Sequence, residues 1–117
     1  MMKEDLGPFL PLSPAVLHIL LALAGEDRHG YAIMQEVARQ SEGQYKLGPG
    51  TLYDNLQKLM NQGMVDEVPR TPDEDPRRRY YRLNSLGRRV LSADIYRLEG
   101  VVHQAKRYLQ SEGMGEA

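Results

Sequence analysis

The stretch between residues 48 and 83 constrains the fold more than any other part of the chain, because its pattern changes from helical to extended within a short length. From Pro49 onward, apolar residues recur at helical spacing with polar residues between them, which predicts an amphipathic helix that ends near Gly63. One face of this helix packs against a core, and the other face is available for a partner. The apolar stripe consists of Leu52, Leu56, Leu59 and Met60.

Two short extended segments follow this helix. Met64–Val68 alternates apolar and acidic residues, and Arg79–Leu83 is a β-prone run that contains two tyrosines. The connecting segment Pro69–Arg78 carries two further prolines, so it cannot continue a helix. We therefore expect a small β-hairpin with a charged loop.

Two more helices are expected before this stretch. Ser13 can cap a helix that has Pro14 at its first position and that runs to about Gly25. A second helix is expected from about His29 to Ser41, and a short turn then leads to the amphipathic helix. The residues expected on one side of the second helix are Tyr31, Ile33, Met34, Val37 and Ala38.

Helix, turn, helix and hairpin follow one another in the order of a winged helix-turn-helix domain. In that arrangement the second helix of the motif is the recognition helix, which enters a DNA groove. The expected fold class is mainly α with a small β-hairpin, and the expected DNA-binding domain covers residues 12–83.

The basic residues are concentrated around the end of the hairpin. Six of the 15 Lys and Arg residues lie between residues 77 and 89, and no Asp or Glu occurs from 76 to 93, although the net charge is -1. Guanidinium groups suit phosphate oxygens, and such clusters bind a phosphate backbone through counterion release. The alternative is a solvated hairpin tip whose arginines offset the acidic residues before them. Next to a helix-turn-helix the cluster favours phosphate contact, and the expected residues are Arg77, Arg78 and Arg79.

The segment from 84 to 110 predicts one long helix with Asn84 as its cap. Its apolar residues alternate steps of four and three, which is a heptad seam suited to a partner helix. The alternative is that the seam packs back on its own domain. We expect a C-terminal dimerisation helix over 84–110 and flexible termini over 1–11 and 111–117. The seam consists of Leu91, Ile95, Leu98, Val102, Ala105 and Leu109.

Three segments resemble a known family. They are HGYAIMQEV, GPGTLYDNLQKLMNQGMV and RRRYYRLNSLGRRVL, and in this order they are similar to the PadR family of bacterial transcriptional regulators over about residues 12 to 92. Asn84 stands where the family commonly has Thr, a replacement that keeps a helix cap. The resemblance implies a homodimeric repressor of the smaller PadR-like kind. The matching positions are Gly50, Thr51, Leu52, Tyr53, Tyr80, Tyr81, Leu83 and Gly87.

The polar face of the expected recognition helix carries the candidate base-reading residues. Gln57 pairs naturally with adenine, and Lys58 with guanine or phosphate. Asp54 repels phosphate, so it can instead cap or orient a neighbour. Tyr53 is open to two interpretations, a phosphate contact or a core position. The residues expected to face DNA on this helix are Thr51, Tyr53, Asp54, Gln57 and Lys58.

The two adjacent tyrosines of the second hairpin segment must point to opposite faces of a strand. Both therefore cannot be core residues. We expect one of them to pack and the other to lie exposed near DNA, and we include Tyr81 among the DNA-binding candidates.

Several other classes of protein are disfavoured. The three histidines, His18, His29 and His103, lie in separate expected elements without metal-ligand spacing or a nucleophile motif, so we expect no enzyme, no metal site and no cofactor. The longest apolar run is too short to span a membrane, no signal-peptide pattern is present, and there is no cysteine, so we expect a cytoplasmic protein. The remaining alternative is a winged-helix protein-interaction module without DNA binding.

The sequence does not identify an effector. The resemblance to PadR-like regulators implies that a small hydrophobic or aromatic effector can act near the dimer interface. The chain contains no Trp, which removes one stacking platform for a flat aromatic ligand. We therefore expect three kinds of partner: double-stranded DNA, a second copy of the chain and such an effector.

Overall fold

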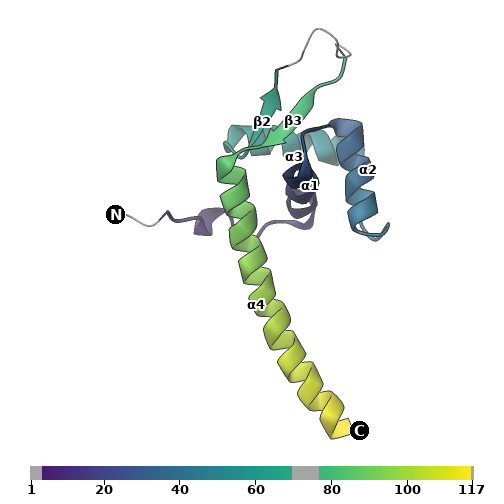
Figure 1. The fold of residues 1–117 in the computed structure, drawn as a ribbon, viewed down its shortest axis with the longest axis vertical. Coiled ribbons are helices and arrows are strands. Elements are labelled where there is room, and N and C mark those ends of the chain that lie inside the picture. Colours follow the sequence, from purple (N-terminus) through teal and green to yellow (C-terminus); the bar gives the residue numbers. More distant parts are fainter. Residues whose placement is uncertain (1–3, 70–76, 117) are drawn as a thin grey trace.

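The computed structural model describes residues 4–69 and 77–116, with side chains up to residue 110. Within these residues, four α-helices and a three-stranded sheet form a small domain from which the last helix projects (Figure 1). The fold confirms a mainly α protein with a small β structure. The elements are the 3-10 helix η1 (Gly7–Phe9), α1 (Pro14–Gly25), β1 (Arg28–His29), α2 (Gly30–Gln40), α3 (Pro49–Asn61), β2 (Val65–Val68), β3 (Tyr80–Leu83) and α4 (Ser85–Glu116).

Local capping sets the helix boundaries. Ser13 Oγ accepts a hydrogen bond from the backbone N–H of Val16 at 3.2 Å, as its capping role predicts. Asn84 Oδ1 accepts from the backbone N–H of Gly87 at 2.9 Å and caps α4 in the same way. After the C-terminal end of α3, Gly63 has a φ of 79°, a left-handed conformation that glycine adopts without steric cost. These positions match the expected helix starts and the expected stop.

The sheet has the order β1-β3-β2, with both pairs antiparallel. β2 and β3 are the expected hairpin, which is the wing of the domain, and in it Val65 pairs with Leu83 and Val68 with Tyr80. β1 was not predicted. It pairs Arg28 with Tyr81 and His29 with Tyr80, so the segment between α1 and α2 lies directly beside the wing.

The core lies where α1, α2, α3 and the sheet meet. α1 is covered on several sides, with Ile19 and Leu20 fully buried. Met60, at the edge of the α3 stripe, is half-buried. On α2, Tyr31 is 63% exposed, and the inner face is formed by Ile33, Glu36 and Val37. The buried members of the α3 stripe are Leu52, Leu56 and Leu59.

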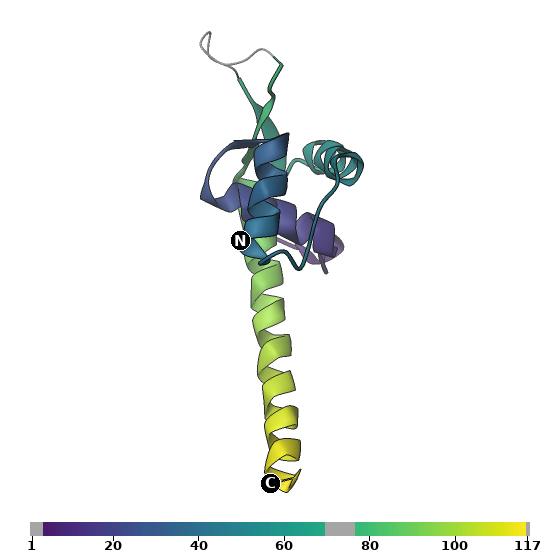
Figure 2. The same cartoon turned by 90° about the vertical axis from the view of Figure 1, so that its right-hand side faces the viewer.

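α4 leaves the domain as a single rod (Figures 1 and 2). Its first turns belong to the core, since Leu91 is only 8% exposed and Ile95 packs against the buried cluster. Leu91 and Ile95 therefore pack on their own domain, which is the alternative to contact with a partner helix. Leu98 is half-buried, and Val102, Ala105 and Leu109 are exposed. The helix also continues to Glu116, beyond the end near residue 110 that the sequence pattern predicted.

Part of the N-terminal segment that was expected to be flexible contacts the domain. Leu6, Phe9 and Leu10 pack against the core cluster. Glu4 forms an ion pair with Arg89 of α4, with 2.7 Å between Oε2 and Nε. Apolar contacts and this ion pair therefore join the segment before α1 to the rest of the domain.

Gly87 allows a close approach between α4 and the wing. A Cβ atom at this position would overlap the backbone carbonyl oxygen of Met64 and the side chain of Leu83. A backbone oxygen cannot move aside without shifting the start of β2, so any side chain here forces α4 or β2 to move.

We predict that Gly87→Ala destabilises the protein by about 1 to 3 kcal/mol, because it overpacks a backbone contact. Gly100→Ala in the same helix is the control, since a Cβ there meets nothing within 4 Å. That variant is expected to be neutral or to stabilise by up to about 1 kcal/mol. Urea denaturation followed by circular dichroism measures both. Equal stability of the two variants would contradict the close approach.

Candidate nucleic-acid interface

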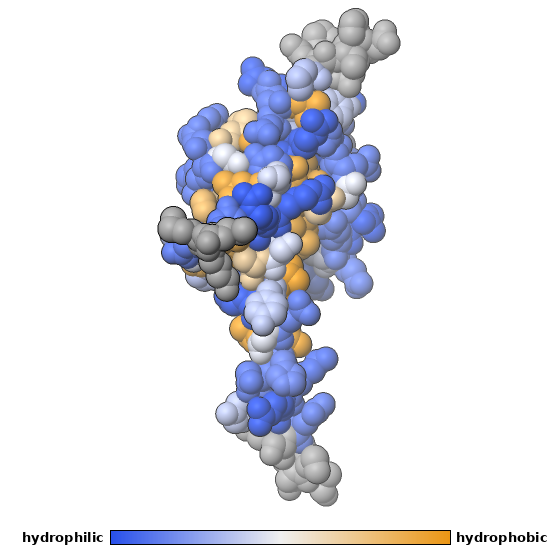
Figure 3. All heavy atoms as spheres, turned by 60° about the vertical axis from the view of Figure 1, so that its left-hand side comes forward, coloured by the Kyte–Doolittle hydropathy of each residue, from blue (hydrophilic) through white to orange (hydrophobic). Residues whose placement is uncertain are grey.

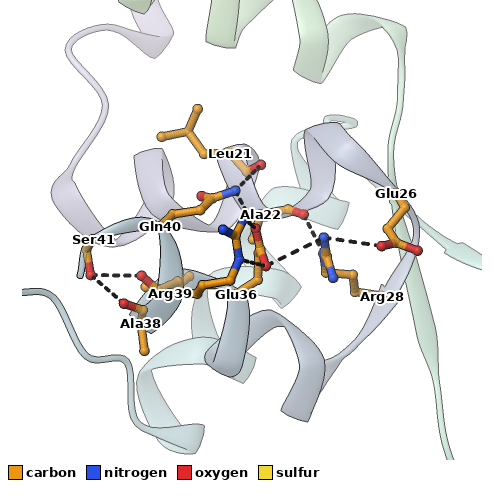
Figure 4. Close-up of polar contacts among 10 residues, drawn as sticks. Leu21, Ala22, Glu26, Arg28, Glu36, Ala38, Arg39, Gln40 and Ser41 are labelled. Atoms are coloured by element: carbon orange, nitrogen blue, oxygen red, sulfur yellow. Dashed lines mark hydrogen bonds and ion pairs between the residues drawn. The ribbon is translucent and has the colours of Figure 1, made fainter. Parts of the chain in front are cut away.

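A buried carboxylate fixes α2 against α1 (Figure 4). Glu36 is 8% exposed and accepts hydrogen bonds from both nitrogens of an Arg39 fork, with 2.8 Å to Arg39 Nε. Gln40 Nε2 donates to Glu36 Oε2 at 2.9 Å and to the carbonyl of Leu21 at 3.4 Å. This network ties the second half of α2 to the carbonyl group of Leu21 in α1.

Arg28 extends the network toward the sheet. Its Nε donates to the carbonyl of Ala22 at 2.8 Å, and its Nη2 lies 3.8 Å from Glu36 Oε1 and 3.4 Å from Glu26 Oε1. Hydrogen bonds from Arg39 are the main reason that the pKa of Glu36 is lowered to about 2, and Gln40 and Arg28 act in the same direction. The charged form of Glu36 thus links α1, β1 and α2.

The polar face of α3 is exposed at the expected positions. Thr51, Asp54, Gln57 and Lys58 are all exposed. Gln57 Nε2 donates to Asn61 Oδ1 at 3.1 Å, one helical turn further along. In Figure 2, α3 is seen nearly end-on at the edge of the domain, beside α1 and α2. The helix therefore presents one continuous polar surface, formed by the residues that the sequence assigned to it.

A polar pocket of about 210 Å³ joins α3 to the start of α2 and to the residues through which the wing loop enters β3. We call it the wing-base pocket, after the base of that loop. Tyr53, from α3, is 49% exposed, and its hydroxyl lies so close to Gly30 that a Cβ atom there would overlap it. Tyr53 is thus a half-exposed pocket residue rather than a core residue. The lining residues are His29, Gly30, Tyr31, Tyr53, Arg77, Arg78 and Arg79.

His29 has two roles at this pocket. Its Nδ1 accepts a hydrogen bond from the backbone N–H of Ala32 at 3.1 Å and caps α2, and its ring stands edge-on to Tyr80 with 5.3 Å between centroids. Its Nε2 lies 3.5 Å from Arg78 Nη1. Burial, and then the Arg78 charge, lower the pKa of His29, which favours the neutral ring. No sequence pattern indicated the contacts of His29 with Tyr80 and Arg78, because they depend on the pairing of β1 with β3.

The structure divides the arginine cluster in two. Arg77, Arg78 and Arg79 line the wing-base pocket, and Arg79 also lies 3.7 Å from Glu67 on the neighbouring strand. The other three arginines have partners elsewhere in the domain. Arg82 pairs with Asp27 at 2.8 Å, Arg89 pairs with Glu4, and Arg88 donates to the carbonyl of Ala24 at 3.4 Å.

Tyr81 must be removed from the candidate DNA-binding residues. Its side chain is 4% exposed and belongs to the core, and burial is the main reason that its pKa is raised. Tyr80, on the opposite face of β3, is half-buried beside His29. The two tyrosines therefore lie on opposite faces of β3, as the alternation predicts, but Tyr81 is the core residue, and Tyr80 is half-buried rather than exposed.

The seam of α4 borders an open groove of about 400 Å³. On the face shown in Figure 3, apolar surface continues from the domain onto the upper part of α4, and the lower part is mostly hydrophilic. The exposed large apolar residues of this helix include Val102 and Leu109. The groove is lined by Ile95, Leu98, Glu99, Val102, His103 and Lys106.

Other kinds of site find no support in the described residues. Over 4–69 and 77–116, no three His, Asp or Glu side chains are grouped as metal ligands would be. His18 stacks on Tyr45, with 4.6 Å between ring centroids, which is a packing role. No helix in the described part of the chain is long and apolar enough to cross a membrane.

Comparisons with known proteins identify the family of this chain. The model of the transcriptional regulator PadR-like family matches residues 16–93. The transcriptional regulator Rv3488 of Mycobacterium tuberculosis is 35% identical over 88 residues, which cover 75% of this chain and 78% of that protein. A PadR family regulator from Clostridium difficile R20291 shares the fold, with a TM-score of 0.70 at 19% identity over 83% of this chain and 99% of that one. RosR of H. salinarum gives a TM-score of 0.60 at 27% identity, covering 91% and 92% of the two chains.

The arrangement of α2, α3 and the paired strands is that of a winged-helix regulator. With the match over residues 16–93, the chain belongs to the PadR-like family of transcriptional regulators. The proteins that it resembles are regulators of transcription rather than enzymes.

We predict that Glu36→Gln destabilises the protein by about 1.5 to 3 kcal/mol at pH 7, because the variant cannot form the charged hydrogen bonds. The pKa of Glu36 is lower in the folded state, so its stabilisation is complete above the usual value of 4.5 and is lost as the pH falls toward about 2. The pH dependence of unfolding between pH 5 and 2 should therefore be shallower in the variant. Urea denaturation at one protein concentration measures both effects.

Glu42→Gln is the control for Glu36→Gln, since Glu42 is exposed in the turn after α2. It should change the free energy of unfolding by no more than about 0.5 kcal/mol. Equal pH dependence in the wild type and the Glu36 variant would show that Glu36 is not the linking charge.

Proposed function

We propose that this regulator binds double-stranded DNA as a homodimer and represses transcription from an inverted-repeat operator. The observation that carries the proposal is the wing-base pocket, because Tyr53 of the recognition helix and the arginines before β3 line the same cavity. A helix in the major groove and a wing on the flanking backbone would then engage one stretch of DNA together.

The exposed face of α3 would read the bases. Thr51 and Gln57 are exposed and can hydrogen-bond base edges, and Lys58 can contact guanine or phosphate. Asp54 lies on the same face and would be repelled by phosphate, so we assign it to orienting its neighbours. Arg77, Arg78 and Arg79 would contact the backbone and hold the helix in register.

The homodimer would form through the exposed seam of α4, with Leu98, Val102, Ala105 and Leu109 facing the partner chain. Leu91 and Ile95 would support it mainly from within the domain core. A two-fold dimer places its recognition helices in successive major grooves. The half-sites would therefore be about 34 Å apart, or a multiple of that distance. A small hydrophobic or aromatic effector would act at the groove beside Leu98, where two chains would meet.

A protein-interaction module is the second candidate function. The balance of Asp54 against Lys58 leaves α3 with little net charge, which favours this alternative. The two functions differ in their response to salt, because only DNA binding releases condensed counterions.

We predict that the wild-type protein binds duplex DNA taken from upstream of its own gene, with an affinity that falls steeply as salt rises. Arg78→Ala should weaken binding to all sequences and reduce the slope of log K against log salt by up to about 0.9 for each phosphate charge that is no longer neutralised. Fluorescence anisotropy at several salt concentrations measures both. Arg107→Ala is the charge-matched control, since Arg107 is exposed far along α4. A wild-type protein that binds without any salt slope would favour the protein-interaction module.

We predict a dimer in sedimentation at micromolar concentration, with about twice the chain mass of 13.3 kDa. Val102→Glu should dissociate it without unfolding the domain, because Val102 is 49% exposed within one chain and would become buried only against a partner. Tyr96→Glu is the control, since Tyr96 is 81% exposed and lies off the seam. A Val102→Glu protein that remains dimeric would exclude this seam as the interface.

A further inference from the structure

The wing-base pocket is lined by hydrogen-bond donors, and none of its described lining residues is acidic. Three arginines, one histidine and two tyrosines contribute to its wall. Glu67, whose carboxylate lies 3.7 Å from Arg79, is outside the pocket. A concave surface of this composition selects an anion with several acceptor oxygens.

The tautomer of His29 shows where in the pocket a hydrogen-bond acceptor is needed. Because Nδ1 accepts the hydrogen bond from Ala32 N–H, the proton of the neutral ring must lie on Nε2. Nε2–H and the Arg78 guanidinium then face each other across 3.5 Å as two donors. Neither group can accept a hydrogen bond from the other, so both donors are satisfied only when an acceptor oxygen atom lies between or beside them.

Tyr53 supplies a third donor from the recognition helix. Gly30 leaves room for its ring at the start of α2, so the hydroxyl is held in the pocket. A volume of about 210 Å³ accommodates a phosphate group with ordered water, each water occupying about 30 Å³.

We infer that the wing-base pocket holds one backbone phosphate of the DNA, with His29 Nε2–H and the Tyr53 hydroxyl as uncharged donors beside the Arg78 guanidinium. The inference rests on the proposed DNA-binding function and adds to it a defined phosphate position at the junction of α2, α3 and the wing. This phosphate fixes the depth and angle of α3 in the groove, because the hydroxyl that binds it is carried by α3 itself.

Uncharged donors have a distinctive effect on binding. Counterion release follows the number of phosphate charges that are neutralised, so removal of a neutral donor lowers affinity without changing the salt slope. Removal of the Arg78 charge lowers both. The two kinds of variant therefore separate the pocket from the general attraction between arginines and DNA.

The test uses the full-length protein and a mixed-sequence duplex of about three helical turns, since a backbone phosphate is present in every sequence. His29→Asn retains a side chain that caps helices well but has no donor at the position of Nε2. Tyr53→Phe retains the ring against Gly30 and removes only the hydroxyl. Each variant should bind roughly 5- to 10-fold more weakly per protomer with an unchanged salt slope. Tyr96→Phe, on α4, should bind as the wild type does.

Circular dichroism and a thermal melt establish that each variant is folded, and Tyr53→Phe keeps the test decisive if His29→Asn is unstable. Wild-type affinity in both variants, together with a salt-dependent wild type, would overturn the pocket and leave DNA binding intact. If His29→Asn or Tyr53→Phe reduced the salt slope as much as Arg78→Ala does, the role of His29 and Tyr53 as uncharged donors would be overturned. A wild type that binds no duplex in a salt-dependent way would overturn the proposed function and the pocket together.

Discussion

The pairing of β1 with β3 is the interaction on which the rest of the arrangement depends. Two residues, Arg28 and His29, pair with Tyr81 and Tyr80 and so place the start of α2 beside the wing. On one side of this short strand, Arg28 reaches Glu36 and the end of α1. On the other, His29 faces Arg78 and the wing-base pocket. The wing also packs on the helices through the core, where Val65 and Leu83 lie in the same buried cluster as the helix residues, and this pairing adds the contact between the wing and the start of α2.

Several ion pairs of the described residues hold the domain together away from the wing-base pocket. Glu36 and Arg39 are committed to holding α2, and Arg82 and Arg89 pair with Asp27 and Glu4. Among the six arginines between residues 77 and 89, those at 77–79 line the pocket. A chain with a net charge of -1 can thus present a local positive site, since much of its remaining charge is neutralised within the domain.

The helices could be predicted from sequence because their signals are local. Ser13 and Asn84 cap helices a few residues away, and Gly63 stops α3 through its own backbone conformation. The third strand could not be predicted, because two residues are too few to show an alternating pattern. The sequence also could not show which arginines line the pocket and which form ion pairs elsewhere, since Asp27 and Glu4 lie 55 and 85 residues from their partners Arg82 and Arg89. The burial of Tyr81 rather than Tyr80 depends on which face of β3 meets the helices, which alternation alone does not specify.

One DNA-binding surface formed by α3, the start of α2 and the base of the wing is the centre of our proposal. Amide chemical shifts recorded by NMR during titration with a short duplex test it most directly, because every described segment reports at once. We expect the largest shifts along α3 from Thr51 to Lys58, at His29 to Tyr31 and at Arg77 to Arg79, with little change in α4 beyond Gly100. Shifts concentrated on the α4 groove, or absent from residues 29–31 while α3 responds, would contradict it.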